Sequence, residues 1–350
     1  MVVAIPSCLF SLKLHLFLMI NKKIISKAAI KRGVDSLLLS KVINGIENKM
    51  EQKQLDNAAL WLRIGLGLVF IIGGTSKLSL LLDSSTEAAM VANYMGTTGY
   101  INELFQDYLF SAGLLCPWTF LTTLSAFELL SGVALAAGFL VRPLSLFYGF
   151  LLWTFVVSLP VDTVPGASVG VSTYTSPAIF VQIRDITLSG MMFVLFNLGA
   201  GALSIDERLR SISGVASKNS QDWQTLGLLL RFSLGMTFIV AGFFSGYAKI
   251  PSFATHQLVL MVLGLIFIFA HGKTLKMGAV ACVLVMIWFM LQKFSIDKSL
   301  IKNLNGVKRE FALAAAAIVL VKLGGGNRFS LQDMLLRVKS YYLFNRAVSK

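Results

Sequence analysis

The chain has 350 residues, of which 56% are hydrophobic and only 14% are charged, and its mean hydropathy is +0.75. Soluble domains carry roughly 25% charged residues, so this composition excludes an ordinary soluble protein. The formal net charge is +14, but a nucleic-acid-binding surface needs its basic residues clustered on one face of a soluble module. Here most of them flank long apolar runs, which indicates membrane topology signals and no nucleic-acid partner.

Eight apolar runs have about the length of a membrane-crossing helix, which needs roughly 20 mostly apolar residues. They are continuously apolar rather than alternating, and this favours helices over a β-barrel. The sequence therefore predicts an all-α integral membrane protein with about eight spans in contact with lipid. The predicted spans are 59–82, 118–140, 143–160, 178–201, 225–248, 254–271, 275–293 and 309–323.

The two halves of the chain share an internal repeat. Residues 62–74 read LRIGLGLVFIIGG, and residues 230–242 read LRFSLGMTFIVAG. The fourth predicted spans also agree, with IRDITLSGMMFVLFNLGAG over 183–201 against KREFALAAAAIVLVKLGGG over 308–326. Self-similarity of this kind is typical of repeat architectures, so we predict two tandem four-helix transmembrane units. Because each unit has an even number of spans, both enter the membrane from the same side.

The repeat and the charge pattern together predict the domain limits. Residues 23–46 place apolar side chains at helical spacing among lysines, which predicts a basic amphipathic helix on the membrane surface or an extension without a role. Met50 precedes the well-patterned part, so a shorter native start is an open alternative. The predicted divisions are a basic amphipathic N-terminal segment (1–55), a first unit (56–212), a linker (213–224), a second unit (225–337) and a basic C-terminal tail (338–350).

The basic residues also orient the predicted spans. Nine Lys and Arg residues precede the first span, whereas the loop 83–117 contains none. The positive-inside rule then places both termini on the cytoplasmic side of a bacterial or archaeal inner membrane. One stretch, 293–310, breaks this pattern because its five basic residues would lie outside.

Ionisable residues inside predicted spans are costly and are therefore candidate functional residues. Glu128 lies about 15 Å inside the second span, Lys77 lies near the outer end of the first span, and Arg184 and Asp185 lie near the outer end of the fourth. We expect these four side chains to form one polar cluster. Residues of the long loops would cover it, namely Asp162, Tyr174, Tyr94, Tyr100 and Tyr108.

Two interpretations of this cluster stay open. It is either a pocket for a small anion or a quinone headgroup, in which Glu128 accepts a proton, or a buried ion-pair group that holds the helices in register. Arg63 and Arg231 lie near the cytoplasmic ends of their spans, where we expect their long side chains to reach the lipid headgroups. The three cysteines are isolated and only three histidines are present, so the sequence disfavours metal, haem and iron–sulfur sites.

Three stretches of the first unit share their pattern with a known family: ALWLRIGLGLVFIIGGTSK (59–77), AFELLSGVALAAGFLVRP (126–143), and IRDI with its LGAG exit (183–201). They resemble the DoxX/DoxD family of four-helix membrane proteins, in particular the DoxD-type subunit of thiosulfate:quinone oxidoreductase. The resemblance covers about 56–210 and, more weakly, 225–337. The polar positions that carry it are Lys77, Glu128, Arg142 and Arg184.

The resemblance implies a membrane subunit that passes electrons from thiosulfate to a quinone beside a partner subunit of a redox complex. Because the chain has no haem, iron–sulfur or flavin motif of its own, such a role would use a bound quinone or a cofactor of the partner. A non-enzymatic membrane scaffold and a small-solute transporter are the alternatives from a different class of function.

Overall fold

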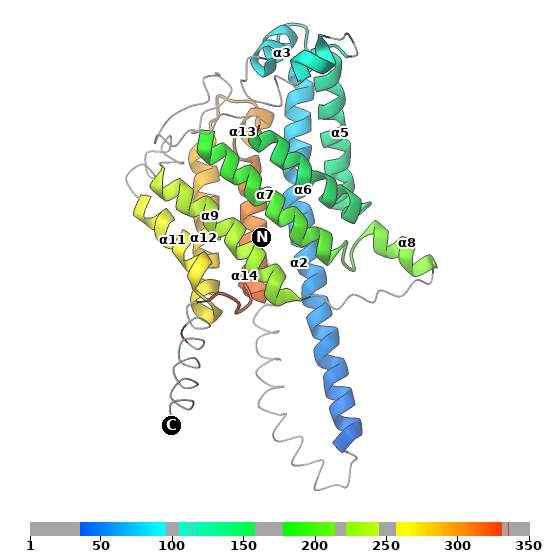
Figure 1. Ribbon diagram of the computed structural model, residues 1–350, viewed down its shortest axis with the longest axis vertical. Coiled ribbons are helices and arrows are strands. Elements are labelled where there is room, and N and C mark those ends of the chain that lie inside the picture. Colours follow the sequence, from blue (N-terminus) through cyan, green and yellow to red (C-terminus); the bar gives the residue numbers. More distant parts are fainter. Residues whose placement is uncertain are drawn as a thin grey trace, which may run out of the picture. The chain divides into compact units, whose positions relative to one another are not determined.

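A computed structural model describes residues 36–95, 105–111, 113, 115–157, 178–213, 222–244, 257–330 and 335. The chain divides into two compact units, residues 1–54 and 55–350. Helix α2 (Ser36–Leu81) runs through both, and its part from Leu55 onward belongs to the second unit. The remaining elements all belong to the second unit (Figure 1). They are α3 (Glu87–Met95), the π-helix η1 (Phe105–Phe110), α5 (Pro117–Ala137), α6 (Val141–Val157), α7 (Ala178–Leu198), α8 (Ile205–Ser213), α9 (Trp223–Phe243), α11 (Gln257–Phe269), α12 (Gly272–Lys293), α13 (Leu300–Gly306) and α14 (Lys308–Leu323).

Each of the eight predicted runs is occupied by a helix, but only part of the prediction of eight spans is confirmed. Within the described part of the chain, four helices are long and apolar enough to cross a membrane: α2 over Lys49–Leu81, α5, α9 and α12. Helices α6 and α11 are apolar but shorter. Helix α2 also begins far upstream of the predicted first span, because residues 36–58 contain no proline and only one glycine to interrupt a helix.

The turn between α5 and α6 shows how local sequence sets the helix ends. Helix α5 begins after Cys116, whose sulfur accepts the Thr119 N–H, and Pro117 occupies its first turn, a position where proline is well tolerated. It ends at Gly138, whose φ of 78° is a left-handed conformation that glycine adopts without strain. The carboxylate of Asp206 accepts the backbone N–H groups of Leu140 and Val141, so α8 caps the start of α6.

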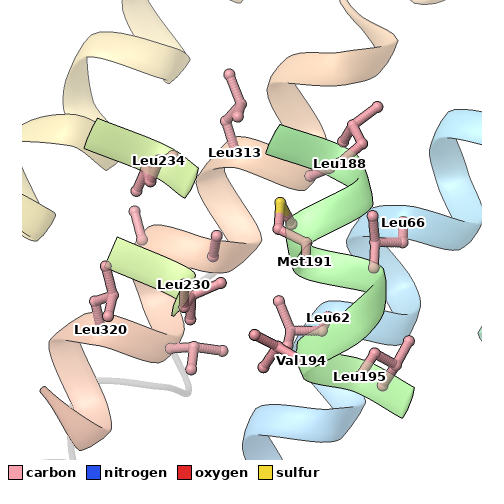
Figure 2. Close-up of a cluster of buried hydrophobic side chains, with 14 of the residues drawn as sticks. Leu62, Leu66, Leu188, Met191, Val194, Leu195, Leu230, Leu234, Leu313 and Leu320 are labelled. Atoms are coloured by element: carbon pink, nitrogen blue, oxygen red, sulfur yellow. The ribbon is translucent and has the colours of Figure 1, made fainter. Parts of the chain in front are cut away.

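The main core lies where α2, α7, α9 and α14 meet (Figure 2). Each of these helices contributes two fully buried leucines at positions that the repeat predicted from the sequence aligns between the halves. Those of α2 match those of α9, and those of α7 match those of α14. The residues are Leu62, Leu66, Leu188, Leu195, Leu230, Leu234, Leu313 and Leu320.

Close helix crossings recur at aligned positions within each half. A Cβ atom on Gly132 of α5 would lie 2.8 Å from the Ile71 nitrogen of α2. A Cβ atom on Gly264 of α11 would lie at the same distance, 2.8 Å, from the Ile239 nitrogen of α9. Glycine therefore lets two backbones approach at both crossings, as small residues do between membrane helices.

The contacts between the halves follow a crossed arrangement. Helix α14, which closes the second half, packs against α2 of the first half at Gly65 and Ala315. Helix α7, which closes the first half, packs against α9 of the second half at Gly190 and Ser233. Gly65 aligns with Ser233, and Gly190 aligns with Ala315. The two contacts between the halves are therefore equivalent: in each, the first helix of one half meets the last helix of the other half at the same aligned positions.

Candidate functional site

Lys77 and Glu128 form an ion pair between α2 and α5. The Lys77 Nζ lies 2.7 Å from each carboxylate oxygen of Glu128. The Glu128 side chain is 4% exposed and the Lys77 side chain 26% exposed. The pair forms because Gly74 of α2 lies directly against the backbone of α5 at Leu129, which brings the two helices close enough for the lysine to reach inward.

Arg184 and Asp185 lie nearby in sequence but bind partners on α14 rather than each other. Arg184 donates to Glu310 at 3.0 Å, and the Arg309 Nε donates to Asp185 at 2.8 Å. The repeat aligns Arg184 with Arg309 and Asp185 with Glu310. Each arginine therefore binds the acidic residue of the opposite half, and the two halves exchange matching ion pairs.

Lys308, the first residue of α14, extends toward the Lys77–Glu128 pair. Its Nζ lies 3.2 Å from the point where a Cβ atom on Gly73 would stand, and Glu128 Oε2 lies 3.7 Å from the same point. The Lys308 ammonium and the Glu128 carboxylate therefore both lie beside Gly73, where any side chain would crowd them. Among the hydrogen bonds and ion pairs between described residues, none is made by the Lys308 ammonium.

These residues form one polar cluster that joins both halves of the second compact unit. It contains four basic side chains and three carboxylates, and three ion pairs use all three carboxylates and leave Lys308 as the excess cation. A buried ionic group is most stable when its charges balance, so the unbalanced charge is the feature of this cluster that needs a chemical explanation. The members of the polar cluster are Lys77, Glu128, Arg184, Asp185, Lys308, Arg309 and Glu310.

Tyr148 of α6, which was not predicted, contacts Ser131, a residue of α5 that lies about one helical turn from Glu128. Its side chain is completely buried, it stacks on Phe70 with ring centroids 3.7 Å apart, and its hydroxyl shares a hydrogen bond with Ser131. The only sequence signal for it is a tyrosine in an apolar run, which also suits a residue at the membrane interface.

The loop residues that were expected to cover the polar cluster lie mostly outside the part of the chain that the structure describes. Asp162, Tyr174 and Tyr100 lie outside the described residues. Tyr94 belongs to α3, but its side chain is not among those described. Tyr108 lies in η1 with 71% of its surface exposed, so it does not cover the polar cluster.

The expectation that Arg63 and Arg231 reach the lipid headgroups was wrong, because both side chains are completely buried. Arg231 donates to the carbonyls of Ile268 at 2.8 Å and Ala270 at 3.1 Å, at the end of α11. Arg63 donates to the carbonyl of Leu203 at 2.6 Å. The last carbonyls of a helix have no partner within the helix. An arginine whose guanidinium binds these carbonyls is more stable than one whose side chain extends to the lipid headgroups.

We expect Arg231→Met to lower the thermal stability of the purified protein, because the substitution leaves the carbonyls at the end of α11 buried without donors. Each unsatisfied buried polar group costs about 1–3 kcal/mol. Thermal unfolding in detergent checks this, with Arg208→Met on the exposed face of α8 as the control. A protein as stable as the Arg208→Met control would show that the Arg231 hydrogen bonds contribute nothing.

Comparison with protein families gives one match: residues 58–159 match the family described as DoxX. The match covers the part of α2 from residue 58, α3, η1, α5 and α6, and no second match is found over the second half. No curated protein and no solved structure matches the chain significantly. The chain is thus an integral membrane protein in which residues 58–159 match the DoxX family, and this stretch is called the DoxX domain below.

Proposed function

We propose that this protein is the membrane subunit of a redox system that oxidises thiosulfate, or a related sulfur anion, and reduces a quinone beside a partner subunit. The observation that carries the proposal is the polar cluster, in which a partly buried Lys77–Glu128 pair of the DoxX domain is accompanied by more positive than negative charge. An excess of positive charge away from bulk water suits a small anion, because charges interact strongly where the dielectric constant is low.

The reaction has a simple balance that assigns a role to each kind of residue. Two thiosulfate anions that join through a new S–S bond release two electrons, and a quinone takes up two electrons and two protons. Lys77 would hold the anion near the outer end of α2, and Glu128 would relay protons. The electrons would pass to the quinone directly or through a cofactor of the partner subunit.

We also infer that the second half is a DoxX-like unit that has lost the site. The aligned leucines, the matched glycine crossings and the exchanged ion pairs support this inference. Gly74 faces Leu129 in the first half and Gly242 faces Met261 in the second, so the place of Glu128 is taken by Leu260. The second half would then be a scaffold for the first.

Thiosulfate-dependent quinone reduction in membranes with and without the protein tests the proposed function. We expect Glu128→Gln to reduce this rate at least tenfold, because the amide can neither relay a proton as a carboxylate does nor balance Lys77. Lys298→Ala, which changes an exposed lysine before α13, is the control and should keep the full rate. Equal rates for Glu128→Gln and Lys298→Ala would contradict the role of Glu128.

A non-enzymatic scaffold or a small-solute transporter is the second candidate, and one observation favours it: three ion pairs satisfy all the carboxylates of the polar cluster within the bundle. A scaffold would give no turnover but would co-purify with a stable partner, and a transporter would carry solute into sealed vesicles. Turnover that depends on Glu128 would decide against both.

A further inference from the structure

Lys308 differs from the rest of the polar cluster in how its charge is compensated. Lys77, Arg184 and Arg309 each bind a carboxylate at 3.0 Å or less. Lys308 has no such partner among the described residues, yet it is half-buried and its ammonium lies beside Gly73, close to the Glu128 carboxylate. One carboxylate, that of Glu128, thus has an ion-paired ammonium and a second, unpaired ammonium nearby.

We propose that Lys308, supplied by the second half, completes a binding site for a small oxyanion with Lys77 and Glu128 of the DoxX domain. The inference rests on the proposed function for the identity of the natural anion. It adds Lys308 as the residue that makes the site selective for a negatively charged ligand. An oxyanion next to Lys308 would supply the negative charge that the polar cluster lacks. Lys77, which is 26% exposed, would form the entrance of the site.

The comparison of the two halves supports a specific role for Lys308. In the repeat, Lys308 aligns with Ile183, and Gly73 aligns with Ala241. The place of Glu128 is taken by Leu260, which is buried. The place beside Gly73 therefore combines a lysine with a carboxylate, whereas the equivalent positions around Ala241 are Ile183 and Leu260, although the surrounding backbone contacts match. A lysine needed only for packing would not require glycine opposite it and a carboxylate beside it.

The position of Lys308 also bears on the basic stretch 293–310, whose positive charges did not fit the orientation predicted by the positive-inside rule. Arg309 turns inward to Asp185, and Lys308 turns inward to Gly73. These two charges serve the polar cluster, so they do not act as free topology signals. The second half then contributes directly to the site of the first half, as a partner subunit would.

The test measures the thermal unfolding of the full purified chain in detergent as sodium sulfate or sodium thiosulfate is added, with sodium chloride holding the ionic strength constant. The wild-type protein should show a saturable rise in unfolding temperature with one or both oxyanions. Lys308→Gln should weaken the apparent affinity at least tenfold. Lys298→Gln, which changes an exposed lysine, is the matched control and should behave as the wild type.

A second readout separates a binding role from a structural one. Without added oxyanion, Lys308→Gln and Lys308→Ile should unfold at the wild-type temperature or above it, because they remove an uncompensated charge. If both variants unfold at clearly lower temperatures, or if Lys308→Gln keeps the oxyanion effect of the wild type, the site is overturned. A wild-type protein that shows no saturable effect overturns it as well.

The outcomes for this site and for the proposed function can be told apart. Oxyanion binding that depends on Lys308, in membranes without thiosulfate-dependent quinone reduction, would leave the site standing and refute the redox function. Turnover whose KM for thiosulfate and kcat are both unchanged in Lys308→Gln would support the redox function and refute the site. A raised KM with an unchanged kcat would support both.

Discussion

Glu310→Arg should destabilise the protein more than any other single substitution in the polar cluster. The variant would place an arginine against Arg184 and beside Arg309, where Glu310 is now 1% exposed. Breaking a buried ion pair by removing one partner costs about 3–5 kcal/mol, and a like charge in its place adds repulsion. We expect the free energy of unfolding in detergent to fall by at least this amount, and the yield of folded protein to fall with it.

The double variant Arg184→Glu with Glu310→Arg gives the matched control. It restores opposite charges across the contact between α7 and α14, and we expect it to recover most of the stability lost in Glu310→Arg alone. The difference between the double variant and the two single variants measures the coupling between the residues. If the double variant is as unstable as the sum of the single variants, the contact between Arg184 and Glu310 does not hold the halves together.

The positions of the helices were predictable because apolar runs of the right length have few alternatives. Helix α9, for example, was predicted over 225–248 and lies at Trp223–Phe243, and its first residue follows Asp222, a typical capping residue. The start of α2 was not predictable in the same way. The predicted first span begins at residue 59, where the sequence becomes apolar, but the more polar residues before it continue the same helix back to Ser36. Length and hydropathy together leave four candidate spans among the described helices.

Only some members of the polar cluster could be predicted from the sequence. Glu128 and Lys77 stand out because charges in apolar runs are rare. Lys308 and Arg309 lie at the edge of a predicted span, where basic residues are common topology signals. Only the fold shows that these two residues belong to the polar cluster. Arg231 was misjudged for the same reason: its partners are carbonyls at the distant end of α11, and no sequence pattern points to them.

The exchanged ion pairs have a consequence for how the two halves depend on each other. Because α7 packs on α9 and α14 packs on α2, each half uses its last helix to complete the other half. Separation would expose charged residues from both α7 and α14 at once, which is costly in an apolar environment. We therefore regard the second half as a covalently attached partner of the DoxX domain rather than as an independent appendage.

Gly132→Ala and Gly264→Ala test this equivalence at the helix crossings. In each variant the new methyl group would lie 2.8 Å from a backbone nitrogen, that of Ile71 or Ile239, so the two helices must move apart. Overpacking of this kind costs about 1–3 kcal/mol. We expect the two variants to lose similar amounts of stability in thermal unfolding, since the crossing of α2 with α5 matches that of α9 with α11.

The two variants should differ in function, because only one of the crossings carries charged residues. Gly132 lies one helical turn from Glu128, so Gly132→Ala should pull Glu128 away from Lys77 and weaken both oxyanion binding and quinone reduction. Gly264→Ala moves the corresponding helix around Leu260, which has no charge to misplace, and should leave both properties near those of the wild type. If Gly264→Ala is harmless while Gly132→Ala unfolds the protein, the halves do not share this crossing. If both impair oxyanion binding equally, the site does not belong to the first half alone.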